Sequence, residues 1–135
     1  MEEYNFTLTN SAAEIEPLQK ELEFTLKADE VRLHFIYAIN VALGEWLANV
    51  VRYAYSGGTH QIEVQCVVSE EDIRLRVTDD GREFDPTLHP AAARAPGSDV
   101  SAPRGLHLIR HLMDDVRHER ARDRNILVMT KHLKN

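Results

Sequence analysis

Residues 75–86 read LRVTDDGREFDP, and the first half of this stretch alternates between apolar and polar side chains. The apolar positions share one parity with Ile73, as expected for a strand with one buried face. Asp79 continues that parity, so a regular strand points its carboxylate inward, where it needs hydrogen-bond donors. Gly81 then permits a turn or a close approach that a side chain would block. Two interpretations fit: a turn at a strand end, the simpler one on these residues alone, and a binding site.

The length and the composition limit what the rest of the chain can be. With 135 residues, 43% of them hydrophobic, the chain is expected to form a single domain over residues 1–135. The net charge of -6 argues against a direct nucleic-acid partner. A single cysteine, no signal peptide and no long apolar run predict a cytoplasmic protein with no membrane partner. Cys66 shares its parity with apolar neighbours, so we expect it in the core.

Apolar periodicity divides the chain into helices and strands. Helices are expected where apolar residues recur three or four apart, and strands where they alternate. The expected helices span residues 11–28, 30–55 and 104–116, and the expected strands span residues 4–9, 60–68, 73–79, 116–122 and 125–133. The last strand carries apolar side chains on both of its faces, which indicates a central position in the sheet. This order predicts an α/β fold, a two-layer sandwich with three helices on one face of a mixed, largely antiparallel sheet.

The long helix expected over residues 30–55 carries two polar side chains beside its apolar stripe. Glu45 and Asn49 are four residues apart, so they stack on one helical face. A half-exposed polar flank explains them, and so does a functional pair that borders the buried face. The helix alone leaves both interpretations open.

The segment from Pro86 to Pro103 has no periodicity and contains four of the five prolines of the chain. An insert of this length in a compact domain is usually a functional lid or a disordered segment. The helix that follows begins near Arg104, Gly105 and Leu106, and its first N–H groups are suited to an anion.

Three motifs occur in one order along the chain: EWLANVVRYAY at residues 45–55, VTDDGREFDP at residues 77–86 and GLHLIRHLMD at residues 105–114. This set resembles the Bergerat-type ATP-binding fold that histidine kinases, gyrase and MutL share. The closest likeness is to the small anti-sigma-factor serine/threonine kinases, and it covers nearly the whole chain. No single motif is specific, but the ordered set is.

The resemblance implies a site for ATP and Mg²⁺. Asn49 would give its side-chain oxygen to Mg²⁺, a hard cation that prefers oxygen ligands. Glu45, one turn earlier, would act as the general base on the attacking hydroxyl. Asp79 would accept a hydrogen bond from the adenine amino group, and Gly81 would let the base approach the backbone. Phe84 also falls within the implied nucleotide-binding motif.

The lid and the start of the last helix would wrap the phosphates, with Arg104, Gly105 and Leu106 as the contact residues. Two positions depart from the family pattern. Glu83 stands where a second glycine is usual and would line the edge of the pocket. Pro103 replaces the first glycine of a Gly-x-Gly and removes an N–H that could bind phosphate, a loss that the charge of Arg104 would offset.

The resemblance therefore predicts an ATP-dependent serine/threonine kinase that regulates transcription by partner switching. It would bind a sigma factor or a similar client, phosphorylate a serine on an anti-sigma-factor antagonist, and form a homodimer. One alternative is a nucleotide-dependent binding module without phosphotransfer, which the changes at Glu83 and Pro103 would also fit. The other is a detached histidine kinase catalytic domain. It is disfavoured because no phosphoacceptor helix precedes the motifs and His34 falls inside the long helix.

Overall fold

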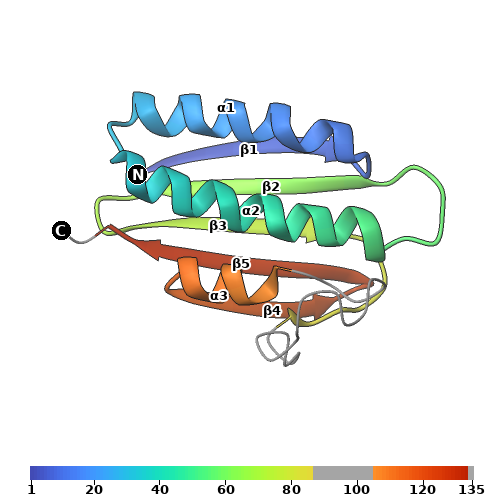
Figure 1. Cartoon of the computed structure of the whole chain (residues 1–135). Helices are drawn as coiled ribbons and strands as arrows, with labels where there is room; N and C mark the ends of the chain where they lie inside the picture. The colour runs from blue at the N-terminus through green and yellow to red at the C-terminus, as the bar shows by residue number, and fades with distance from the viewer. Residues whose placement is uncertain (87–104, 134–135) are drawn as a thin grey trace.

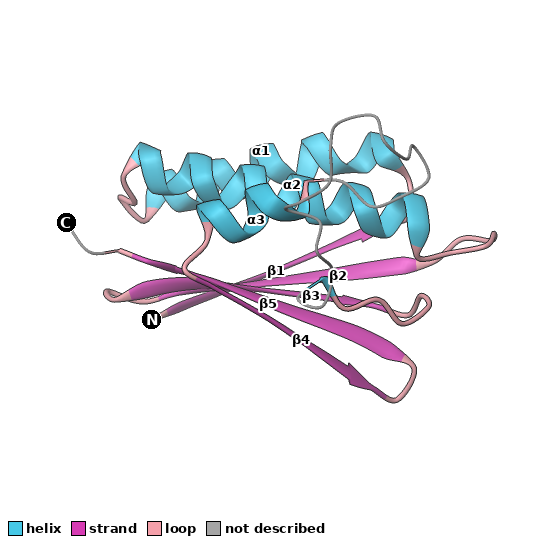
Figure 2. Ribbon diagram, turned by 60° about the horizontal axis from the view of Figure 1, so that its bottom comes forward, coloured by secondary structure: helices cyan, strands magenta, loops and turns pink. Residues whose placement is uncertain are grey.

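The protein folds into two layers, a sheet and a layer of helices. The computed structural model describes residues 1–86 and 105–133. Within them, the strands are β1 (Glu2–Thr9), β2 (Gln61–Val68), β3 (Asp72–Asp79), β4 (Asp115–Ala121) and β5 (Arg124–His132). The helices are a 3-10 turn η1 (Ala12–Glu14), α1 (Ile15–Ala28), α2 (Leu33–Tyr53) and α3 (Leu106–Leu112). The α-helices all lie on one face of the sheet (Figures 1 and 2), which confirms the expected two-layer α/β architecture.

The sheet has the strand order β1-β2-β3-β5-β4, and each pairing in the described part of the chain is antiparallel. β5 lies between β3 and β4, as its apolar residues on both parities predict. Asp79 is paired with Asn125, and Asn125 is paired with Arg120, so the three share one row across the sheet. His118 lies two rows further along the sheet, opposite Leu127. This register places the residues of the candidate site.

The core lies between the sheet and the helices. α1 contributes three leucines one turn apart (Leu18, Leu22 and Leu26), while β2 and β3 bury alternate residues. Cys66 is fully buried in this cluster, so its assignment to the core is confirmed. No helix in the described residues is long and apolar enough to cross a membrane.

The last helix is shorter than the sequence predicts. It was expected over residues 104–116, but α3 ends at Leu112, and Met113 already has an extended backbone with φ −104° and ψ 152°. The N–H of Asp114 donates to the carbonyl of Thr130 at 2.8 Å, so the chain has joined the sheet by that point. Met113 is buried in spite of this change. Its apolar side chain fits the helical spacing in the sequence, and it is equally well buried from the extended backbone that leads into β4.

Candidate functional site

Asp79 is a buried carboxylate at the end of β3. Only 1% of the residue is exposed, which confirms the inward direction that its parity predicts. Its Oδ1 accepts hydrogen bonds from the N–H of Gly81 at 2.9 Å and from Nδ2 of Asn125 at 3.0 Å. Burial raises the pKa of the Asp79 carboxyl, and these two hydrogen bonds oppose part of that rise. Oδ2 receives no hydrogen bond from residues 1–86 or 105–133, so it keeps the capacity to accept one from a ligand.

The turn interpretation and the site interpretation of Asp79 are compatible. The bond from Gly81 spans two residues, which is the pattern of an Asx turn. The simpler interpretation of residues 75–86 is therefore correct as a description of the backbone. The turn uses only one oxygen of the carboxylate, Oδ1.

Gly81 is required by the close packing of this turn on the end of α2. A Cβ at Gly81 would lie 2.5 Å from Cβ of Ala54 and 2.6 Å from its carbonyl oxygen. The next residue, Arg82, donates its N–H to the same Ala54 carbonyl at 2.9 Å. This close packing explains why a glycine stands at position 81, independently of the expected approach of adenine.

Asn125 is a part of the site that the sequence did not reveal. Its Nδ2 donates to Asp79 and, at 2.7 Å, to the carbonyl of Arg82. Its Oδ1 accepts the N–H of Phe84 at 3.2 Å. Asn125 therefore ties the carboxylate to the segment after it. Only the pairing of β3 with β5 could have identified this residue, because it stands alone before an apolar run.

Asn49 and Glu45 lie on α2 as expected, but their environments differ. Asn49 is only 6% exposed, so the interpretation as a half-exposed flank is wrong for it. Its Nδ2 donates to the Glu45 carbonyl at 2.8 Å. The atom of this amide that Mg²⁺ would prefer as a ligand is the oxygen. Glu45 is partly exposed.

The start of α3 lies against Glu45. Gly105 precedes α3 with a left-handed φ of 76°. A Cβ at this position would lie 1.8 Å from Oε1 of Glu45. The structure thus brings together two expected site residues that are 60 positions apart. Leu106, in contrast, is buried in the core, so its side chain is not available to a ligand. Arg104 and Pro103, like the lid expected up to residue 103, lie outside the described residues.

A narrow pocket opens between these elements. It is lined by Trp46, Asn49, Val50, Tyr53, Ala54, Asp79, Arg82, Phe84 and Asn125. Its free volume is about 20 Å³, which is room for roughly one water molecule. The ring of Phe84 stacks on the indole of Trp46, with 5.9 Å between the centroids and 20° between the planes. Phe84 and Trp46 therefore form one wall of the pocket.

Two polar features complete the description of the pocket. The indole N–H of Trp46 is buried and has no hydrogen-bond partner within the described part of the chain. A buried donor without a partner is costly, so a ligand acceptor near it would be favourable. Glu83 is exposed and is not among the residues that line this pocket, so its expected place at the pocket edge is not observed.

Comparisons with known proteins place these features in context. The family model described as the histidine kinase-like ATPase domain matches residues 8–131. A serine/threonine-protein kinase of Bordetella bronchiseptica, BtrW, is 27% identical over 115 residues, which cover 82% of this chain and 80% of that protein. The expected family resemblance is therefore confirmed.

Two solved structures share the fold. One contains the RsbU and RsbW domains of Rv1364c from Mycobacterium tuberculosis and matches with a TM-score of 0.72 and 17% identity. The match covers all of this chain and 33% of the other, so this chain spans about a third of its length. The nucleotide-free catalytic domain of the histidine kinase ThkA matches with a TM-score of 0.54 and 14% identity, and the match covers 100% of both chains.

Proposed function

Because the chain belongs to the histidine kinase-like ATPase domain family, we propose that it binds Mg-ATP and phosphorylates a serine on an anti-sigma-factor antagonist. The observation that carries the proposal is the buried carboxylate of Asp79, whose Oδ2 has no donor from the described residues and which lines a pocket with Asn49. Burying a carboxylate whose oxygen lacks a donor is costly for a fold. In a binding site, such an oxygen can accept a hydrogen bond from the amino group of a ligand.

The residues of the pocket take separate roles in this proposal. Asp79 Oδ2 accepts a hydrogen bond from the adenine amino group, and Asn125 keeps the carboxylate in place. The oxygen of Asn49 holds Mg²⁺, which supplies charge neutralisation at the phosphates when it is bound. Glu45 accepts the proton of the serine hydroxyl. Gly105 lets the start of α3 lie beside Glu45.

Adenine does not fit the pocket as it stands. A free volume of about 20 Å³ is far below that of a purine, so the residues that line the pocket have to move apart when a nucleotide enters. Asp79 and Asn125, in contrast, are held in place by the pairing of β3 with β5.

The relatives suggest which kinds of partner to propose. We propose partner switching in the cytoplasm, where the protein captures a sigma factor or a similar client and releases it according to the state of the antagonist. A homodimer is part of this proposal. The similarity to a serine/threonine-protein kinase and to an RsbW domain supports the antagonist as the phosphorylated partner.

A second candidate is a nucleotide-dependent binding module without phosphotransfer. The narrow pocket favours it, since a small cavity binds nucleotide more weakly than an open one. The binding module is also consistent with Glu83 and Pro103, which stand where the family has glycines.

Two measurements separate the candidates. A thermal-shift titration with Mg-ATP, Mg-ADP and EDTA first tests for a nucleotide site, and a kinase and a nucleotide-binding module both give a shift that depends on Mg²⁺. Transfer of labelled γ-phosphate to serine-bearing antagonists from the same genome then distinguishes the two. A shift without transfer to any antagonist supports the binding module, and no shift at all rejects both candidates.

A further inference from the structure

Trp46 is a buried residue of α2 that lines the candidate pocket one position after Glu45. Only 2% of it is exposed, and its indole ring belongs both to the core and to the wall of the pocket. The indole N–H is buried without a hydrogen-bond partner among the described residues. An apolar side chain in this place would leave no donor unpaired, and an unpaired buried donor costs stability. Core packing therefore explains the ring of Trp46 but not its N–H.

The other buried polar groups of the pocket wall show which atoms the protein has already paired. Asn125 donates from Nδ2 to Asp79 and to a backbone carbonyl. Its Oδ1 accepts the N–H of Phe84 at 3.2 Å and lies 3.0 Å from Nε2 of His118. Asp79 accepts two hydrogen bonds at Oδ1 and none at Oδ2 from the described residues. Oδ2 of Asp79 and the N–H of Trp46 are thus a buried acceptor and a buried donor on one pocket wall, and both keep the capacity to bond a ligand.

A donor and an acceptor on one wall are complementary to a ligand that presents an acceptor beside a donor. Adenine does so, because its amino group is a donor and the ring nitrogens on either side of it, N1 and N7, are acceptors. Guanine carries a carbonyl oxygen in place of the amino group, and its N1 is a donor. When the amino group of adenine lies on Asp79, a neighbouring ring nitrogen remains for a second protein donor.

We propose that Trp46 is a specificity-determining residue of the nucleotide site, whose indole N–H donates a hydrogen bond to a ring nitrogen of adenine while Oδ2 of Asp79 accepts one from the amino group. This inference rests on the proposed binding of ATP and adds a second contact to the base. Trp46 shares its helical face with Asn49 and Val50, three and four residues further on, and all three line the pocket. The residue that recognises the base and the residue proposed to hold Mg²⁺ therefore lie one turn apart on α2.

The hydrogen bond is tested first in the spectrum of the wild type. Trp46 is the only tryptophan of the chain, so a proton–nitrogen correlation spectrum contains one indole N–H signal. ATP should move this signal downfield, because the N–H begins to donate. Deaza analogues of ATP, in which a C–H replaces N1 or N7, keep the ring current of the base, and the analogue that lacks the bonded nitrogen should leave the signal upfield of its place in the ATP complex. If ATP and both analogues move the signal alike, the inference is overturned.

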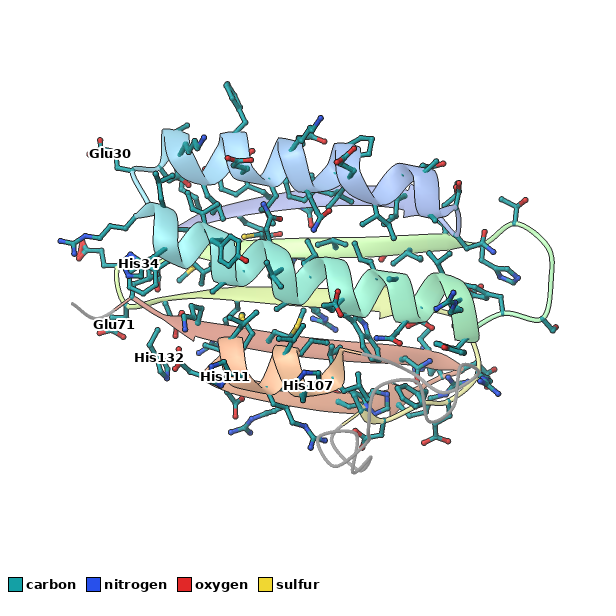
Figure 3. The ribbon with its side chains drawn as sticks, in the orientation of Figure 1. Glu30, His34, Glu71, His107, His111 and His132 are labelled. Atoms are coloured by element: carbon teal, nitrogen blue, oxygen red, sulfur yellow. The ribbon has the colours of Figure 1, made fainter. Side chains whose placement is uncertain are left out.

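The ring signals of two distant histidines serve as the control for this spectrum. His34 and His132 lie at one end of the molecule (Figure 3), where His132 pairs with Asp72 of β3, whereas Asp79 is at the other end of that strand. Both signals should stay in place with each nucleotide. A displacement that matches that of the indole would indicate a change of the whole domain and would count against a local hydrogen bond.

Affinities measured by calorimetry test the same bond. The analogue without the bonded nitrogen should bind the wild type about threefold to tenfold more weakly than ATP, the range for one neutral hydrogen bond. Trp46→Phe keeps an aromatic ring but has no N–H, so it should bind ATP and that analogue equally. Because two ligands are compared in the same variant, any effect of the smaller ring on packing cancels.

The outcomes separate this inference from the proposed function. ATP that binds the wild type no more tightly than either analogue rejects the role of Trp46 and leaves the nucleotide site standing. An analogue that loses as much affinity in Trp46→Phe as in the wild type shows that another donor meets the ring nitrogen, which also rejects it. If ATP does not bind the wild type at all, the proposed function fails and the inference fails with it.

Discussion

Replacing Gly105 by alanine tests the contact between the start of α3 and Glu45. The new Cβ would lie 1.8 Å from Oε1 and 2.8 Å from Cδ of Glu45, far inside van der Waals contact. These atoms belong to the end of a flexible side chain, so Glu45 can rotate away. The backbone cannot adapt as easily, because a φ of 76° costs a residue with a Cβ about 1–2 kcal/mol.

We therefore expect Gly105→Ala to lower the free energy of unfolding by about 1–2 kcal/mol, mostly through φ. The same change pushes the carboxylate of Glu45 out of place, so phosphotransfer should fall by about a hundredfold, the usual scale for a lost general base. Urea denaturation measures the first effect, and transfer of labelled phosphate measures the second. Gly57→Ala is the matched control, because a Cβ at Gly57 meets nothing within 4 Å.

A double variant separates the two effects. In a Glu45→Ala background, Gly105→Ala should still cost stability but should cause no further loss of transfer, since the displaced group is already absent. The reasoning is refuted if Gly105→Ala is as stable as Gly57→Ala. It is also refuted if its effect on transfer is the same with and without the carboxylate of Glu45.

Three further predictions follow from the site and the core. Gly81→Ala should destabilise the protein by about 1–3 kcal/mol in urea denaturation, because its Cβ meets the backbone of Ala54 at 2.6 Å and neither side can rotate away. Asn49→Ala should remove the Mg²⁺-dependent part of ATP affinity in titrations with and without EDTA, whereas Glu45→Ala should keep that affinity and lose about a hundredfold in transfer. Burial raises the pKa of the Cys66 thiol to about 12. The stability that the neutral thiol contributes is therefore complete below the ordinary thiol pKa and is lost as the pH rises toward about 12. In urea denaturation, the free energy of unfolding should fall between pH 8 and pH 10 by more in the wild type than in Cys66→Ala.

Much of the fold follows from periodicity in the sequence. The apolar stripe of residues 30–55 predicts α2, and the alternation up to Val77 predicts both β3 and the inward direction of Asp79. Those signals are local, since a helical or a strand period is set by neighbours along the chain. The end of α3 is less certain from sequence because Met113 satisfies the helical period and the core at once, while the backbone bond of Asp114 to Thr130 stops the helix.

The contacts between residues of the candidate site, in contrast, depend on strand pairing and not on local periodicity. Asn125 and His118 contribute to the environment of Asp79 only because β5 lies between β3 and β4 and is paired in one particular register. A shift of that register by one residue would turn Asn125 away from the site. No spacing along the chain encodes this choice. The motifs could therefore identify Asp79 and Asn49, but not the residues that hold the carboxylate in place.

The measurement that tests the central claim most directly is a calorimetric titration of Mg-ATP into the wild type and Asp79→Asn. The account predicts saturable binding to the wild type that is about tenfold or more weaker in the variant, because the amide offers a donor where adenine needs an acceptor. It also predicts that Asp79→Asn is at least as stable as the wild type at pH 7. The raised pKa of Asp79 means that the folded protein disfavours the carboxylate, so stability falls as the pH rises above the usual carboxyl range, and asparagine removes that cost. Equal affinities in the two proteins, or weaker binding that accompanies a loss of folding, would contradict the account.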